Sequence, residues 1–98
     1  MTNTKPQLIC RVAETFLIKG RGVVLCPDAS IPDGVVLRNG DPVTLRTPEG
    51  RTLETRIKAL ELITPNPKDI VPMMLEAVRE KSDAPIGSEV WTRPGLAL

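Results

Sequence analysis

The side chains that could do chemistry in this chain are arginines, lysines and carboxylates, because histidine is absent. Histidine is the commonest general base and metal ligand, so acid–base catalysis and most metal centres lose their usual residue. Asp28 and Asp33 share one loop, and Glu80 and Asp83 share another, but carboxylates spaced in this way within loops generally form turns. The sequence therefore predicts no catalytic residue, no metal site and no cofactor, and we expect that the protein is not an enzyme.

The cysteines, Cys10 and Cys26, lack metal-ligand spacing and are too few for a disulfide scaffold. A reactive thiol would need a neighbouring base or cation that lowers its pKa. We expect both to be buried, reduced thiols that pack as small hydrophobes. The first residues are polar, and no apolar run reaches the length of a signal peptide or a bilayer span. A cytoplasmic protein without a membrane partner is therefore expected.

Basic side chains are concentrated in the first half of the chain, although the net charge is only +1. Lys19 and Arg21 lie at a Gly-Arg-Gly turn, where a phosphate contact and incidental turn chemistry are both open interpretations. Further candidates for nucleic-acid contacts follow along the chain: Arg46, Arg51, Arg56 and Lys58. Strand faces that only contact solvent also carry basic residues at such positions. One Phe and one Trp provide no row of aromatic rings on which successive bases could stack.

Proline and glycine interrupt the chain at short intervals, which is typical of short strands joined by turns. Alternation predicts a strand over Leu8–Lys19 with Val12, Phe16 and Ile18 on one side, where Phe16 would pack in the core. A two-residue type II′ turn at Gly20-Arg21 is expected to follow. The next short strands are expected over Gly22–Cys26, Val35–Leu37 and Pro42–Thr47.

Local patterns leave the second half of the chain open between helix and strand. Thr52–Ile63 alternates as a strand as far as Ala59, where a change of parity indicates a β-bulge, but it also has apolar residues at helical spacing. Asp69–Lys81 begins with a capping residue and has an early proline, which slightly favours a helix. Ile86–Thr92 is expected to be the last strand. Met73, Met74 and Trp91 are expected in the core.

The order of these pieces resembles the second domain of elongation factor Tu, the β-barrel of the translational GTPases. The matching segments are Glu14–Val24 with its Gly-Arg-Gly, Gly40–Val43, Ile57–Leu62, Ile70–Leu75 and Ile86–Gly95. The resemblance implies an all-β fold: a single small, closed antiparallel β-barrel over residues 8–95, with a disordered tail at 1–7 and a short one at 96–98. Thr52–Ile63 and Ile70–Val78 would both be strands, and closure would leave no exposed edges. The chain lacks the phosphate-binding loop that GTP hydrolysis requires.

The resemblance also implies a function. In the family, this barrel helps to hold the terminal adenosine and aminoacyl group of charged tRNA, and it contacts ribosomal RNA. The family's pocket positions fall on Glu14, Phe16 and Glu61 here, although Glu61 could equally lie on a solvated face. The implied protein is a non-catalytic binding module whose partner is RNA or a ribosome-associated protein. The alternative is a protein–protein adaptor with no nucleic-acid role.

Overall fold

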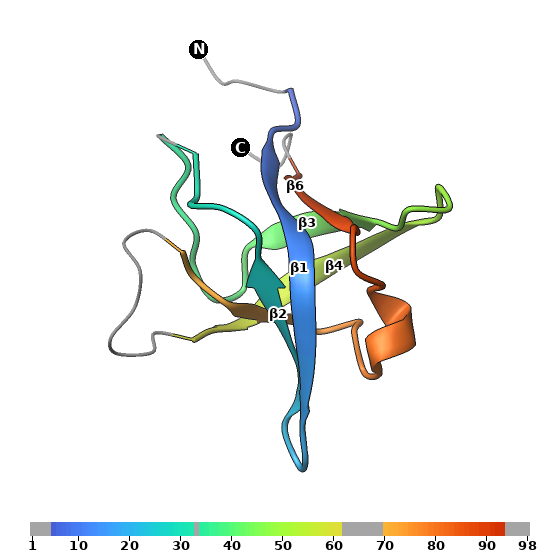
Figure 1. The fold of residues 1–98 in the computed structure, drawn as a ribbon. Coiled ribbons are helices and arrows are strands. Elements are labelled where there is room, and N and C mark those ends of the chain that lie inside the picture. The colour runs from blue at the N-terminus through green and yellow to red at the C-terminus, as the bar shows by residue number, and fades with distance from the viewer. Residues whose placement is uncertain (1–4, 33, 62–69, 94–98) are drawn as a thin grey trace.

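The computed structural model describes residues 5–32, 34–61 and 70–93, and the strands in these ranges form one closed antiparallel barrel (Figure 1). Around the barrel the order is β1-β2-β5-β4-β3-β6. The bounds are β1 Leu8–Ile18, β2 Gly22–Pro27, β3 Pro42–Arg46, β4 Thr52–Leu60, β5 Met73–Leu75 and β6 Glu89–Thr92, with a 3-10 turn η1 at Lys81–Asp83. The all-β barrel expected from the sequence is confirmed.

Strand β1 bends so that it can pair with two neighbours. Its first part pairs with β6 and its second part with β2, and the register shifts between Leu8 and Cys10 and between Val12 and Glu14. Such irregularities bend a strand and increase its twist. The first shift also accounts for the burial of two successive residues, Ile9 and Cys10. By pairing with β6 and with β2, the bent strand β1 helps to close the barrel.

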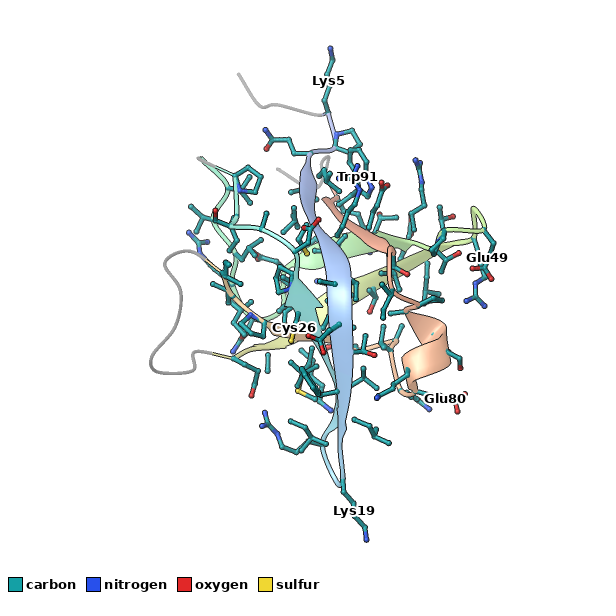
Figure 2. The ribbon with its side chains drawn as sticks, viewed as in Figure 1. Lys5, Lys19, Cys26, Glu49, Glu80 and Trp91 are labelled. Carbon is teal, nitrogen blue, oxygen red and sulfur yellow. The ribbon has the colours of Figure 1, made fainter. Side chains whose placement is uncertain are left out.

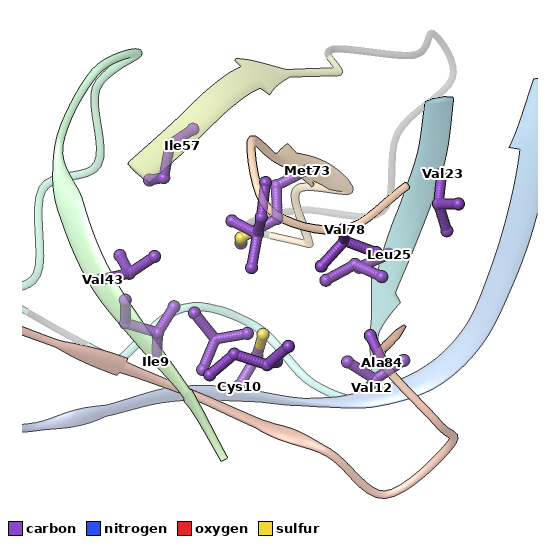
Figure 3. Packing of buried hydrophobic residues seen from close by; sticks show 13 residues of the cluster. Ile9, Cys10, Val12, Val23, Leu25, Val43, Ile57, Met73, Val78 and Ala84 are labelled. Atoms are coloured by element: carbon purple, nitrogen blue, oxygen red, sulfur yellow. The ribbon is translucent and has the colours of Figure 1, made fainter. Parts of the chain in front are cut away.

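The interior is filled by aliphatic side chains that come from every strand of the described barrel (Figure 3). Val23, Leu45, Met73 and Val90 have no exposed surface. Burying a side chain of this size contributes roughly 1.5–3 kcal/mol, so the apolar core is the main source of stability. Met74 is buried as well, which confirms the core positions predicted for the methionines of β5.

The second half of the chain supplies strands where local patterns left a choice. The described part of 69–81 holds β5 and the first residue of η1, and no α-helix. The helix favoured by local spacing is therefore wrong, and the strand implied by the resemblance is confirmed, although it is shorter. Every residue of β5 is buried between β2 and β4, so no alternation marks it. The bulge predicted near Ala59 is confirmed by a register shift between Ile57 and Ala59. Residues 62 and 63 lie outside the described residues.

The predictions for two short strands need correction. Val35–Leu37 has no strand partner: Val35 and Leu37 pack against the core, whereas Val36 is exposed. The last strand begins at Glu89, since Gly87 has a φ of 93° in the turn that precedes it. Just before β1, the Gln7 N–H donates to the Thr92 hydroxyl oxygen, and the Thr92 N–H donates to the Gln7 carbonyl. Residues 1–4 and 96–98 of the predicted tails lie outside the described residues.

The hairpin of β1 and β2 projects beyond the rest of the barrel (Figure 1). Its loop is Lys19-Gly20-Arg21, and the Arg21 N–H donates to the Ile18 carbonyl over 2.9 Å. Gly20 is the third residue of this turn and has a φ of 82°, so the predicted type II′ turn with glycine in the second position is wrong.

The described residues contain no helix that is long and apolar enough to cross a membrane.

Phe16 is 49% exposed, so its predicted place in the core is wrong. The register shift after Val12 reverses which side chains of β1 face inward. Residues opposite each other in a ladder share a face. Beyond the shift, Thr15 lies opposite Leu25, which belongs to the core cluster, whereas Phe16 lies opposite Val24, which does not. Phe16 therefore points to the outer side.

Candidate functional site

The basic residues predicted to contact nucleic acid lie in separate places on the barrel. Lys19, Arg21 and Lys58 line one hollow, and Arg46 lines another beside Trp91. Figure 2 shows Lys19 at the tip of the hairpin and Trp91 near the opposite end of the molecule. Neither hollow includes the remaining candidates: Arg51 lies in the turn between β3 and β4, and Arg56 donates to the Gly40 carbonyl over 2.9 Å.

The first hollow, which we call the hairpin groove, is an open depression of about 800 Å³ beside the loop of the β1–β2 hairpin. Its apolar lining includes Met74, Leu75 and Val78. Its cationic lining is Lys19, Arg21, Lys58 and Arg79, and its carboxylate is Glu76. Sequence reasoning missed Arg79, because nothing in the local pattern shows that the segment after β5 returns beneath the hairpin.

Arg21 and Glu61 form a bidentate ion pair at the edge of the hairpin groove. The Arg21 Nη1 and Nη2 atoms donate to the Glu61 Oε1 and Oε2 atoms over 3.1 and 3.0 Å. This hydrogen bonding and the carboxylate charge raise the pKa of Arg21 above its ordinary value. The Glu61 side chain is only 17% exposed, so Glu61 is an ion-pair partner rather than part of a solvated face.

Further contacts hold the hairpin loop against β4 and β5. The Lys58 Nζ atom donates to the Arg21 carbonyl over 2.8 Å, and Arg21 Nη2 lies 3.7 Å from the Met74 Sδ atom. A Cβ atom at Gly22 would lie 3.0 Å from Met74 Cε. Because its partner is an uncharged carbonyl, the Lys58 ammonium is not neutralised by this contact.

The family's pocket positions do not form one cluster. Glu14 lies opposite Cys26 in the β1–β2 ladder, and both Glu14 and Phe16 are exposed. Within the described residues no hydrogen bond or ion pair joins either of them to Glu61, whose carboxylate is engaged by Arg21. Glu14 and Phe16 lie on β1, whereas Glu61 directly follows β4, and β2 and β5 lie between these two strands in the barrel order.

Neither cysteine resembles a nucleophile. Both are free; Cys10 is buried as predicted, but Cys26 is only half-buried, so the prediction holds for one of them. Burial, with a smaller effect of the Asp28 charge, raises the pKa of Cys10 to about 12. Burial, followed by the charge of Glu14, also raises the pKa of Cys26. Raised pKa values keep both thiols protonated, and a protonated thiol is a poor nucleophile.

The Asp83 carboxylate stabilises a turn, as the spacing predicted, whereas the Asp28 carboxylate accepts from β1. The Arg79 and Glu80 N–H groups donate to the Asp83 Oδ2 atom over 2.9 and 3.1 Å, and these bonds lower the pKa of Asp83. The Arg11 N–H donates to Asp28 Oδ1 over 3.3 Å. Asp33 is not among the described residues. In the part of the chain that the structure describes, no group of three or more His, Cys, Asp or Glu side chains is placed to hold a metal ion.

Trp91 does not lie in the core as predicted. Val90 fills the inward position of β6, so the neighbouring Trp91 faces outward and is half-buried.

Comparison of the chain with protein-family models, with curated proteins and with solved structures gave no match. The charge and geometry of the described residues are therefore the basis for the functional proposal.

Proposed function

We propose that the protein is a non-catalytic binding module that contacts RNA through the hairpin groove, as its resemblance to the elongation factor Tu barrel implies. The observation that carries the proposal is the lining of this groove, where Lys19, Arg21, Lys58 and Arg79 accompany the carboxylate Glu76. Lysine and arginine side chains neutralise phosphates, and this electrostatic contact supplies the sequence-independent part of the affinity.

The contacts within the groove fit this role. Lys58 is held in place by an uncharged carbonyl, and Lys19 is exposed at the hairpin tip. Arg21 gives two of its donors to Glu61, but a guanidinium has five N–H donors, so others remain for a phosphate oxygen. The free cysteines agree with a reducing compartment, and a cytoplasmic location is part of the proposal.

The salt dependence of RNA affinity tests this proposal. The full chain is titrated with a tRNA and with a ribosomal RNA fragment at several salt concentrations. Log affinity falls as log salt rises, and each lost phosphate contact should make this negative slope shallower by about 0.7–0.9. We expect such a loss for Lys19→Gln, but none for Arg51→Gln, which removes a positive charge outside the groove. Absence of binding at low salt, or equal losses in both variants, would overturn the proposal.

A protein–protein adaptor is the second candidate, and the exposed apolar residues of the hairpin favour it. Phe16, Leu17 and Ile18 are 49%, 61% and 37% exposed. Adjacent exposed apolar residues often mark a protein-binding surface. Binding to ribosomal subunits separates the candidates: an apolar contact should be weakened by Leu17→Ser and should change little with salt, whereas a phosphate contact should weaken steeply as salt rises.

A further inference from the structure

The outer face of β3 and β6 carries an aromatic ring between arginine side chains. Strand alternation turns Thr44 and Arg46 outward, and Thr44 lies opposite Trp91 in the β3–β6 ladder. A hollow of about 410 Å³ opens there, and Arg93 and Glu54 complete its charged lining. We call it the tryptophan hollow. In Figure 2 its Trp91 lies far from Lys19, which marks the hairpin groove.

The Trp91 ring is held in a fixed position. Its Nε1–H donates to the Glu89 Oε1 atom over 3.0 Å, and Glu89 also pairs with Arg11 over 3.4 Å. The guanidinium carbon of Arg46 lies 5.7 Å from the centre of the ring, within the range of a cation–π contact. None of the ion pairs among the described residues involves Arg46, so its N–H donors have no carboxylate partner there.

Arg93 is weakly bound by its neighbours. Its Nη2 atom lies 3.8 Å from Glu54 Oε1, and its Nη1 atom donates to the Thr55 carbonyl over 3.4 Å. Both distances exceed the usual 2.7–2.9 Å of a charge-assisted hydrogen bond. The Glu54 side chain is 73% exposed and can turn into water. An incoming anion could therefore replace Glu54 as the partner of Arg93.

We propose that the tryptophan hollow binds a single nucleotide unit, with its base stacked on the Arg46–Trp91 pair and its phosphate on Arg93. Guanidinium and indole planes both accept a stacked base, and arginine pairs with phosphate through parallel N–H donors. The hollow lies in the lower part of the range for small-molecule sites, about 300–1,000 Å³. A free mononucleotide and one unit of an RNA strand share this chemistry. The site goes beyond the hairpin groove and does not depend on it.

Trp91 is the single tryptophan of the chain, so its fluorescence reports directly on the hollow. The full chain is titrated with adenosine monophosphate, adenosine, inorganic phosphate and octa-adenylate. We expect saturable quenching by adenosine monophosphate, and much weaker effects of adenosine or phosphate alone. Arg93→Gln should weaken nucleotide binding roughly tenfold, the loss expected for one charge-assisted hydrogen bond. Glu54→Gln should strengthen it severalfold, because it removes the competing carboxylate.

The control variant is Lys19→Gln, which should leave the quenching unchanged even where it weakens RNA binding at the hairpin groove. Saturation by octa-adenylate without saturation by the mononucleotide supports the site and identifies a strand as its ligand. Absence of saturable quenching by both would overturn the proposal, as would an equal effect of phosphate alone. Since misfolding cannot strengthen binding, Glu54→Gln remains decisive if thermal melts show that Arg93→Gln is unfolded; unchanged affinity in Glu54→Gln would count against the site.

Discussion

Ser88 has a fully buried hydroxyl for which the described residues provide no hydrogen-bond partner. Its backbone is satisfied, since its N–H donates to Pro85 and its carbonyl accepts from Val12. A buried hydroxyl without a partner loses its hydration without compensation. We therefore expect Ser88→Ala to raise the free energy of unfolding by about 1 kcal/mol, measured by urea denaturation followed by circular dichroism.

Thr55 provides the matched control for Ser88. Its hydroxyl is also buried, but it accepts the Ala77 N–H over 3.0 Å. Thr55→Val keeps the shape of the side chain and leaves that N–H without a partner, so it should lower the free energy of unfolding by about 1–2 kcal/mol. Changes of the same sign in Ser88→Ala and Thr55→Val would contradict this account.

For single residues, burial could be predicted from the sequence at some positions and not at others. Met73 and Met74 are in the core as predicted, but Phe16 and Trp91 are not. Alternation is reliable only while the register is constant, and the shift after Val12 that places Phe16 outside depends on pairing with β2. Trp91 faces outward because its smaller neighbour fills the interior. Both outcomes depend on contacts between segments far apart in sequence.

At the scale of elements, the order of short segments and their resemblance to a known barrel predicted the closed sheet, whereas local spacing alone did not. The fully buried β5 carries no alternation, so strand and helix cannot be distinguished there from the sequence. The ion pair of Arg21 with Glu61, which lie 40 positions apart, has no local signal at all. The hairpin groove could thus be predicted as a basic turn, but not as a groove with Arg79 in its lining.

Gly22 is the first residue of β2 and directly follows the hairpin loop. It has a φ of 133°, and a Cβ there would lie 3.0 Å from Met74 Cε. Gly20 has a φ of 82°, but no neighbouring atom lies within 4 Å of the position that its Cβ would take, so Gly20→Ala meets only backbone strain, about 1–2 kcal/mol. Gly22→Ala should lower the free energy of unfolding by more than Gly20→Ala does, measured by thermal and urea denaturation. An equal or smaller loss in Gly22→Ala would show that the Met74 contact is unimportant.

At the scale of the whole molecule, closure makes the strands interdependent. Every strand has a neighbour on each side, and β1 pairs with β6 on one side and with β2 on the other. A closed barrel has no edge strand that could separate while the others stay paired. Exposure of a core residue of β1 should therefore require opening of the entire barrel rather than local fraying.

Cys10 makes this cooperativity measurable, because it lies in the core on β1 and its pKa is raised from 9.0 to about 12. The folded protein holds the thiol proton more tightly than the unfolded chain does, so the resulting stabilisation is fully present below pH 9.0 and is lost as pH rises toward about 12. At pH 8, alkylation of Cys10 should follow the free energy of global unfolding measured in urea, while the half-buried Cys26 reacts faster. Mass spectrometry of digested, labelled protein distinguishes the two sites. Labelling of Cys10 at low urea, well ahead of the loss of the circular dichroism signal, would show that the barrel opens locally at β1.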